Sequence, residues 1–264
     1  MYNNLDAFIN NQNLEDLHLE ICSGLAQAKS DMSSRVIPHY EMQKEFDKLF
    51  EYKNNDRARI AAVADHGESF LTTDRERSIF HSLDREQKKR FLQLYKKAYW
   101  DGEYVRIKFT KKDFSTHPEA TFYNSMCEWH PNANLFPGVL KFIESLPFLE
   151  VGRVLFFISY HYLHTDVHYD RKDQVFDGKN HFIWFNPFKQ KEFYLIDHNK
   201  KIHDVDCRSA FFDPRFLHGA RPSPKMTYTL RVDGQLEKLF CEKVGLPWQP
   251  RTATALAVQA QETV

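Results

Sequence analysis

Short apolar segments separated by polar turns fill the carboxyl-terminal half of this 264-residue chain, and they limit what it can fold into. Val154–Ile158 is a run of aromatic and branched residues that is too short for a typical helix and suits a buried strand. Later segments of the same kind are His181–Phe185, Glu192–Ile196, Lys201–Val205, Ser209–Asp213 and Met226–Val232. Short strands at such regular spacing predict a β-sandwich or a β-barrel.

A cluster of metal-ligand side chains follows Val154–Ile158 almost directly. Its members are His161, His164, Asp166, His168 and Asp170. Side chains two residues apart in an extended chain project to the same side, so His164 and Asp166 can share one ion. An imidazole together with a carboxylate suits a divalent metal such as iron.

A third ligand and an anion-binding residue lie farther along the chain. His218 ends an apolar segment, and in a barrel of about eight strands it can face His164 across the interior. The last predicted strand has a polar face that includes Thr229 and Arg231, and an apolar face that begins at Tyr228. If the apolar face packs against helices, the polar face looks inward, where the Arg231 guanidinium fits a carboxylate through two parallel hydrogen bonds.

The amino-terminal half has the pattern of amphipathic helices. Tyr40–Lys53 and segments that begin near Thr73 and Asp84 place apolar residues at helical spacing. Pro137 opens a further short helix, and Tyr104–Phe109 alternates as a short strand.

These patterns predict a mainly β protein with flanking helices, of the α+β class. We expect one domain over residues 1–264, in which residues 1–148 are mostly helical and pack on a β core at residues 149–236. Residues 237–264 form a carboxyl-terminal segment that frays from about residue 252.

Composition excludes several classes of protein. Lys plus Arg equals Asp plus Glu at 36 each, which removes the electrostatic attraction on which nucleic-acid binding relies. The four cysteines form no CxxC pair, no apolar run is long enough for a membrane span, and the amino terminus does not resemble a secretory signal. We therefore expect a cytoplasmic protein with reduced thiols, a small-molecule or peptide substrate, and neither nucleic acid nor membrane as a partner.

The ordered set of motifs resembles a known enzyme superfamily. His164, Asp166, His218 and Arg231 are similar to the HxD...H...R pattern of the iron(II)- and 2-oxoglutarate-dependent oxygenases, whose core is a double-stranded β-helix, a jelly-roll fold that also occurs in cupins. The segments LHTD, FIWFNP, FFDPRFLHG and YTLRVDG resemble, in order, the ligand strand, the following buried strand, the distal-histidine strand and the cosubstrate strand of that superfamily. The resemblance covers roughly Val151 to Leu236.

The resemblance implies a chemistry and assigns its residues. His164, Asp166 and His218 would bind Fe(II), with no catalytic residue beyond these ligands, and 2-oxoglutarate and O2 would be consumed. Arg231 would bind the distal carboxylate of 2-oxoglutarate, with a further hydrogen bond from Thr229. The expected activity is hydroxylation of an unactivated C–H bond in a small molecule, an amino acid derivative or a peptide side chain, with release of succinate and CO2. A carboxylate at position 166 argues against halogenation.

Substrate contacts can be named only as candidates. Tyr162, Trp184 and Arg153 are expected to line the substrate pocket. His117, Trp129 and His130 belong to an irregular segment that can cover a site.

Three alternatives stay open at this stage. His168 and Asp170 form a second HxD pair, and a register shift of four residues leaves the same face inward. Arg221 competes with Arg231 as the anion-binding residue. A metal-binding β-barrel that senses or structures without turnover is the alternative to an enzyme, because a fold does not prescribe a function.

Overall fold

The computed structural model describes most of the predicted β core and part of the amino-terminal region. The described residues are 1–28, 32–34, 78, 81–82, 84–85, 102–110, 118–159, 165–168, 178–221, 223 and 226–251. The predicted helices at Tyr40–Lys53 and after Thr73 and Asp84 fall mostly or wholly outside them. No helix among these residues is long and apolar enough to cross a membrane.

Strands dominate the described part of the chain, and short helices lie between them. The strands are β1 (Tyr2–Asn4), β2 (Met32–Ser34), β3 (Gly102–Thr110), β4 (Cys127–Trp129), β5 (Phe148–Ser159), β6 (Thr165–His168), β7 (His181–Phe185), β8 (Phe193–Ile196), β9 (Ile202–Asp204), β10 (Ser209–Phe212), β11 (Leu217–Ala220) and β12 (Thr227–Leu236). The helices are α1 (Gln12–Glu15), α2 (His18–Gln27), α7 (Pro137–Glu144) and α8 (Lys238–Val244), with 3-10 turns η2 (Pro118–Phe122), η3 (Asn124–Met126), η4 (Pro131–Leu135) and η5 (Pro187–Lys189).

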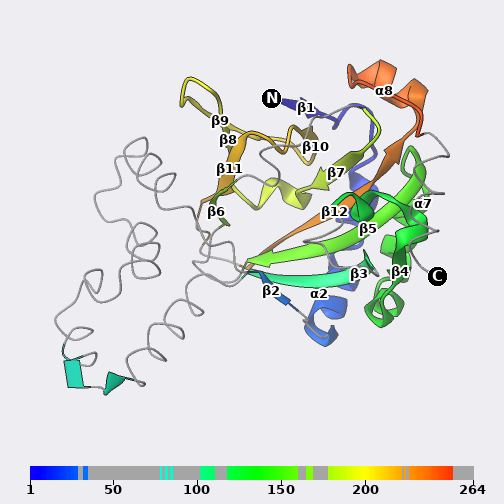
Figure 1. The fold of residues 1–264 in the computed structure, drawn as a ribbon. Coiled ribbons are helices and arrows are strands. Elements are labelled where there is room, and N and C mark those ends of the chain that lie inside the picture. Colours follow the sequence, from blue (N-terminus) through cyan, green and yellow to red (C-terminus); the bar gives the residue numbers. More distant parts are fainter. Residues whose placement is uncertain are drawn as a thin grey trace, which may run out of the picture.

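Two antiparallel sheets form a β-sandwich, seen with the shorter strands on the left and the longer ones on the right in Figure 1. The eight-stranded major sheet has the order β1-β10-β7-β12-β5-β3-β2, with β4 paired to β3, and the four-stranded minor sheet has the order β6-β11-β8-β9. The last eight strands pair as one long hairpin, β5 with β12, β6 with β11, β7 with β10 and β8 with β9, rolled across both sheets. This strand order is a jelly roll, so the predicted double-stranded β-helix is confirmed.

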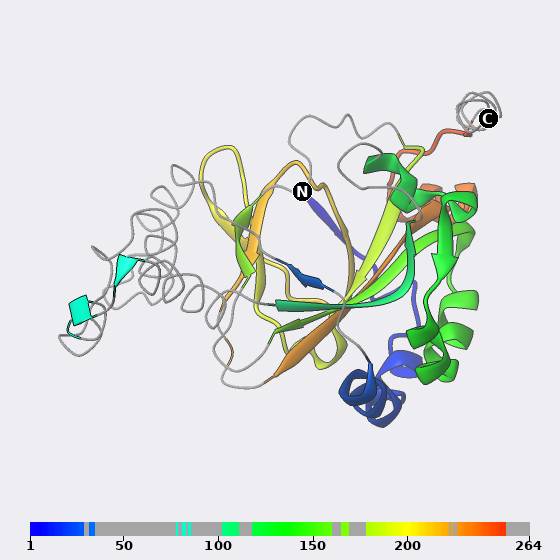
Figure 2. The same ribbon diagram turned by 60° about the horizontal axis from the view of Figure 1, so that its bottom comes forward.

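Helices cover the outer face of the major sheet, away from the minor sheet (Figure 2). Phe136, at the start of α7, packs on Phe156 of β5 with ring centroids 5.2 Å apart. Gly24 of α2 lies so close to Phe136 that an added Cβ would overlap the ring. The Glu20 carboxylate of α2 accepts hydrogen bonds from the first backbone amides of α7, among them that of Gly138 at 2.9 Å, and so ties the two helices together.

The predicted strands are found, most of them with shifted ends, and several strands are additional. Val154–Ile158 is the middle of the longer β5, and the five later apolar segments correspond to β7, β8, β9, β10 and β12. The strand expected at Tyr104–Phe109 and the helix expected from Pro137 are also present, as β3 and α7. The described residues of the amino-terminal region supply four strands to the major sheet, of which only β3 was predicted.

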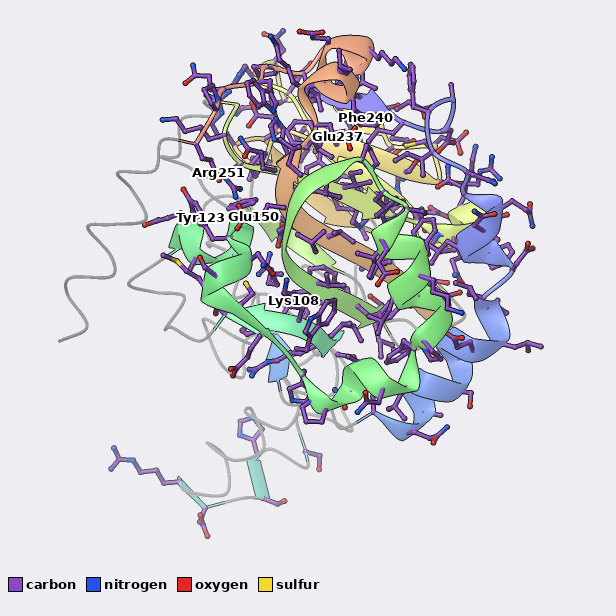
Figure 3. The ribbon with its side chains drawn as sticks, turned by 90° about the vertical axis from the view of Figure 1, so that its right-hand side faces the viewer. Lys108, Tyr123, Glu150, Glu237, Phe240 and Arg251 are labelled. Atoms are coloured by element: carbon purple, nitrogen blue, oxygen red, sulfur yellow. The ribbon has the colours of Figure 1, made fainter. Side chains whose placement is uncertain are left out.

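A polar cluster fixes the end of the described chain onto the sandwich (Figure 3). Arg251 makes an ion pair with Glu150 at 2.5 Å, and its guanidinium lies 4.2 Å from the centre of the Tyr123 ring. Lys108 donates to the carbonyl of Val151 at 2.7 Å, and burial lowers the pKa of its amine. These contacts are structural, because they join neighbouring segments outside the space between the two sheets.

Candidate metal and cosubstrate site

His218 lies on the minor sheet and faces the space between the two sheets. It is 3% exposed, and its ring centre is 5.6 Å from that of Phe193 and 5.2 Å from that of Phe212, which belongs to the major sheet. Its Nδ1 is 2.9 Å from the carbonyl oxygen of Phe216, which can only accept. Nδ1 therefore carries the proton, and this tautomer has its lone pair on Nε2, as in histidines that bind metals.

The partner strand of β11 brings a second histidine position to His218. His168 is the direct cross-strand partner of His218, while Thr165 is the partner of Ala220. Between these two pairs lies one residue of β11 but two residues of β6. The strand β6 therefore contains a β-bulge that includes positions 166 and 167. Directly opposed residues in an antiparallel pair have Cα atoms only about 4.5–5.5 Å apart. The register therefore places position 168 next to His218.

The remaining members of the predicted cluster are less fully described. His161, His164 and Asp170 lie outside the described residues, as does the substrate candidate Tyr162, and for Asp166 and His168 only the strand position is described. Within the described side chains no group of three His, Cys, Asp or Glu residues is arranged to hold a metal ion.

Arg231 lies in the major sheet and also faces the interior. Its cross-strand partner Trp184 packs on Phe193 of the minor sheet, with ring centres 4.7 Å apart. Directly opposed residues share a face of the sheet, so Arg231 and Trp184 both look toward the minor sheet. The Arg231 guanidinium is buried and lies 4.0 Å from the centre of the Phe182 ring.

Arg231 has an acidic partner that the sequence did not predict. Its Nε donates to Oδ1 of Asp233 at 2.7 Å, and Arg153 donates from its Nε to Oδ2 of the same carboxylate at 2.6 Å. Asp233 is completely buried. One carboxylate thus holds two guanidiniums, so the three groups together carry one net positive charge.

Two threonine hydroxyls lie next to this group. Thr227 and Thr229 precede Arg231 on the same face of β12, and each side chain is 1% exposed. Within the described structure neither Oγ1 atom has a hydrogen-bond partner. A buried polar atom without a partner is costly, and a bound ligand with carboxylate oxygens would satisfy it.

Arg221, the competing anion-binding residue, lies on the other face of the minor sheet. Its guanidinium pairs with Asp204 at 2.8 Å and lies 5.4 Å from the centre of the Tyr194 ring. Tyr194 pairs with Gly219 and its neighbour Leu195 pairs with His218, so Tyr194 points away from the His218 side.

The other candidates are spread over the molecule. Trp129 is 52% exposed in β4, and His130 is the N-cap of η4, where its ring accepts from the amide of Asn132 at 3.2 Å. His117 lies outside the described residues. Trp184 and Arg153 line the interior beside Arg231, whereas the sequence pattern did not single out Asp233, Phe193 or Phe212.

Fold and site together define this chain as a double-stranded β-helix protein whose interior has a histidine on one wall and arginines on the other. No protein-family model and no curated protein matches it. Structures that do match include oxygenases of the superfamily that the motifs resemble, among them a 2OG-Fe(II) oxygenase family oxidoreductase from Burkholderia pseudomallei, at 11% identity and a TM-score of 0.32 over 69% of this chain and 90% of that one.

Two further structures show how far this similarity extends. A prolyl hydroxylase from Trichoplax adhaerens, solved in complex with a hypoxia inducible factor peptide fragment, matches at 10% identity and a TM-score of 0.31, over 74% of this chain and 92% of that one. The non-heme monooxygenase ThoJ matches at 16% identity and a TM-score of 0.27. The match covers 37% of this chain and 49% of that one, so this chain spans only about half of that protein's length. Because the TM-scores are low, the fold assignment rests on the strand order of this chain.

Proposed function

We propose that this protein is a non-haem Fe(II)- and 2-oxoglutarate-dependent dioxygenase that hydroxylates a small molecule, an amino acid derivative or a peptide side chain. The observation that carries the proposal is the register of β6 with β11, which sets His168 opposite His218 inside a double-stranded β-helix. Arg231 on the facing wall supplies the positive charge that a dicarboxylic cosubstrate needs.

We assign the metal ligands to His168, Asp170 and His218. This is the second of the two HxD pairs in the sequence, and the register favours it over His164 and Asp166. Residue 164 precedes Thr165, which already pairs with Ala220 and not with His218. Two imidazoles and one carboxylate form the facial triad that leaves open positions on Fe(II).

Each of the described residues has a role in holding the metal and its cosubstrate. The Phe216 carbonyl fixes the ring of His218 so that Nε2 is the ligand atom. Asp233 accepts from Nε of Arg231 and so orients the guanidinium, which would bind a ligand carboxylate. The guanidiniums that Asp233 holds together would attract that carboxylate, and Thr229 Oγ1 would donate a hydrogen bond to it.

Aromatic rings shape the space between these two groups. Phe193, Phe212 and Trp184 are buried and lie between His218 and the Arg231 wall. They exclude water, which strengthens each charged hydrogen bond in the interior. With 2-oxoglutarate and O2, bound iron supplies an oxidative decarboxylation to succinate and CO2 that is coupled to C–H hydroxylation.

The test is metal-dependent turnover of 2-oxoglutarate. Purified protein with Fe(II) is expected to convert 2-oxoglutarate to succinate, and His218→Ala is expected to lose both the bound iron and succinate formation. His203→Ala is the matched control, because His203 lies on the same face of the sheet, two strands from His218, where it pairs with Asp197 at 2.9 Å. Stoichiometric iron binding without any succinate would instead support a non-catalytic metal-binding β-barrel.

A further inference from the structure

Arg106 of β3 belongs to the same face of the major sheet as Arg231. It is the cross-strand partner of Leu155 in β5, and Leu155 is in turn the partner of Arg231 in β12. Arg231 pairs onward with Trp184 in β7. Directly opposed residues share a face, so this row runs across four strands and all its members look toward the minor-sheet side.

Arg106 differs from Arg153 and Arg231 in having no acidic partner within the described part of the chain. Its Nε is buried and has no hydrogen-bond partner among the described residues. Its guanidinium makes a cation–π contact with the Phe109 ring, 4.3 Å from the ring centre. Arg153 and Arg231, in contrast, share Asp233. A half-buried guanidinium without an anion is a position where an anionic ligand gains binding energy.

The surroundings of Arg106 are otherwise apolar and aromatic. Tyr104 precedes it by two residues on the same strand and contacts Phe157 edge to face, with ring centres 4.6 Å apart. Leu155 beside it is 2% exposed. A charged group among rings is the usual composition of a small-molecule site, in which the apolar wall gives affinity and the polar group gives orientation.

We propose that Arg106 binds the carboxylate of the primary substrate, which is a monoanion with an apolar body. The site lies two strands from Arg231, which corresponds to about 10 Å in the plane of the sheet. The Arg106 site is therefore separate from the position proposed for the cosubstrate carboxylate at Arg231. A monoanion matches the single charge of Arg106. This inference rests on the proposed function, since it names the substrate class of the same interior.

Matched acids and amides test it directly. The probes are N-acetyl-L-leucine, N-acetyl-L-phenylalanine, L-leucine and L-phenylalanine, each beside its carboxamide, titrated by calorimetry into anaerobic protein loaded with Fe(II) and 2-oxoglutarate. We expect at least one acid to bind about tenfold or more tightly than its amide. Arg106→Gln should remove this preference, Arg106→Lys should keep part of it, and Arg215→Gln should leave it unchanged, since Arg215 pairs with Asp213 at the surface.

The outcomes separate this inference from the proposed function. Equal affinity for acid and amide, no binding of any probe, or an acid preference that survives Arg106→Gln would each overturn it. Preference for the N-acetylated acids would indicate a peptide carboxyl terminus, and preference for the free acids would indicate an amino acid. Succinate formation without added substrate is measured on the same preparations, so a working oxygenase that lacks the acid preference refutes only the role of Arg106.

Discussion

The two walls of the sandwich are built differently, and the difference indicates which wall provides stability and which provides chemistry. In the major sheet, β5 has 12 residues and β12 has 10, and every residue of β12 is buried. The strands of the minor sheet have three or four residues, and the sheet ends at the bulged strand β6. Long buried strands are stabilised by many cross-strand pairs, whereas bulges are frequent beside active sites.

The walls also differ in how they hold charge. The major sheet neutralises its buried arginines partly through Asp233, so a change there should mainly cost stability. The minor sheet carries His218, whose ring is oriented by a backbone carbonyl, so a change there should mainly cost function. Four substitutions test this contrast.

The largest effect is expected at the proposed metal ligands of the minor sheet. His168→Ala should weaken Fe(II) binding at least about a hundredfold, because losing a group that merely orients a ligand already costs about 10–100-fold. Succinate formation should fall to background, while the melting temperature of the metal-free protein changes little. Metal content after desalting and succinate yield are the measurements.

His164→Ala is the matched control for that prediction. Because Thr165 pairs with Ala220, we expect His164→Ala to retain iron and turnover. The reverse pattern, with iron lost in His164→Ala and kept in His168→Ala, would restore His164 and Asp166 as the ligand pair.

On the major sheet, Asp233→Asn should lower the free energy of unfolding by about 3–5 kcal/mol. The substitution leaves the buried guanidinium of Arg231 and the half-buried one of Arg153 without their shared carboxylate, and breaking a buried pair in this way is strongly destabilising. Urea denaturation measures the change. Asp213→Asn removes a surface partner of Arg215 and should cost less than about 1 kcal/mol. Equal losses in the two variants would contradict the proposed division between the walls.

Sequence patterns predicted the strands of the major sheet better than those of the minor sheet. The strands β5, β7 and β12 carry runs of buried apolar residues, which have a clear period and composition. β6 is TDVH and β11 is LHGA, each only four residues long, and β1 is the polar YNN. These strands are held by backbone pairing and not by apolar side chains, so no hydrophobic pattern marks them.

The candidate site could be predicted by residue type but not by pairing. His218, Arg231 and Thr229 were named from the sequence, and the structure places all three on the interior faces of the two sheets. A period of two leaves both HxD pairs possible, and our proposal of the second pair depends on the register of a bulged strand, which no sequence pattern predicts. The sharing of Asp233 by two arginines joins β5 to β12, and such a contact has no local signal in the chain.

A buried lysine at the start of the minor sheet gives a smaller, pH-dependent effect. Lys191 is 7% exposed, and burial lowers the pKa of its amine from the ordinary 10.5 to about 8. Below pH 8 both folded and unfolded chains carry the charge, so the folded state bears the full desolvation cost, on the order of 3 kcal/mol. Between pH 8 and 10.5 the unfolded chain binds more protons, so stability should rise with pH.

Lys191→Met tests this by removing the buried charge. The variant should be more stable than the natural protein at pH 7, by about 1–3 kcal/mol, and should lose the rise in stability between pH 8 and 10.5. Urea denaturation across that range measures both. Lys201→Met alters an exposed lysine nearby and should keep the rise. A variant that is less stable at pH 7 would show that the Lys191 amine is held by favourable contacts.

The smallest effect is expected at a single hydroxyl on the major sheet. Thr229→Val replaces a buried Oγ1 that lacks a partner in the described structure with a methyl group of similar size, so folding stability should not fall. The affinity for 2-oxoglutarate should fall about fivefold, which corresponds to about 1 kcal/mol for one hydrogen bond. Thr227→Val, two residues farther from Arg231 on the same face, should leave that affinity unchanged. Calorimetry with anaerobic Fe(II)-loaded protein measures both variants. If only Thr227→Val weakens binding, the cosubstrate carboxylate lies nearer the start of β12 than Arg231 does. A residue of the major sheet other than Arg231 would then have to bind it.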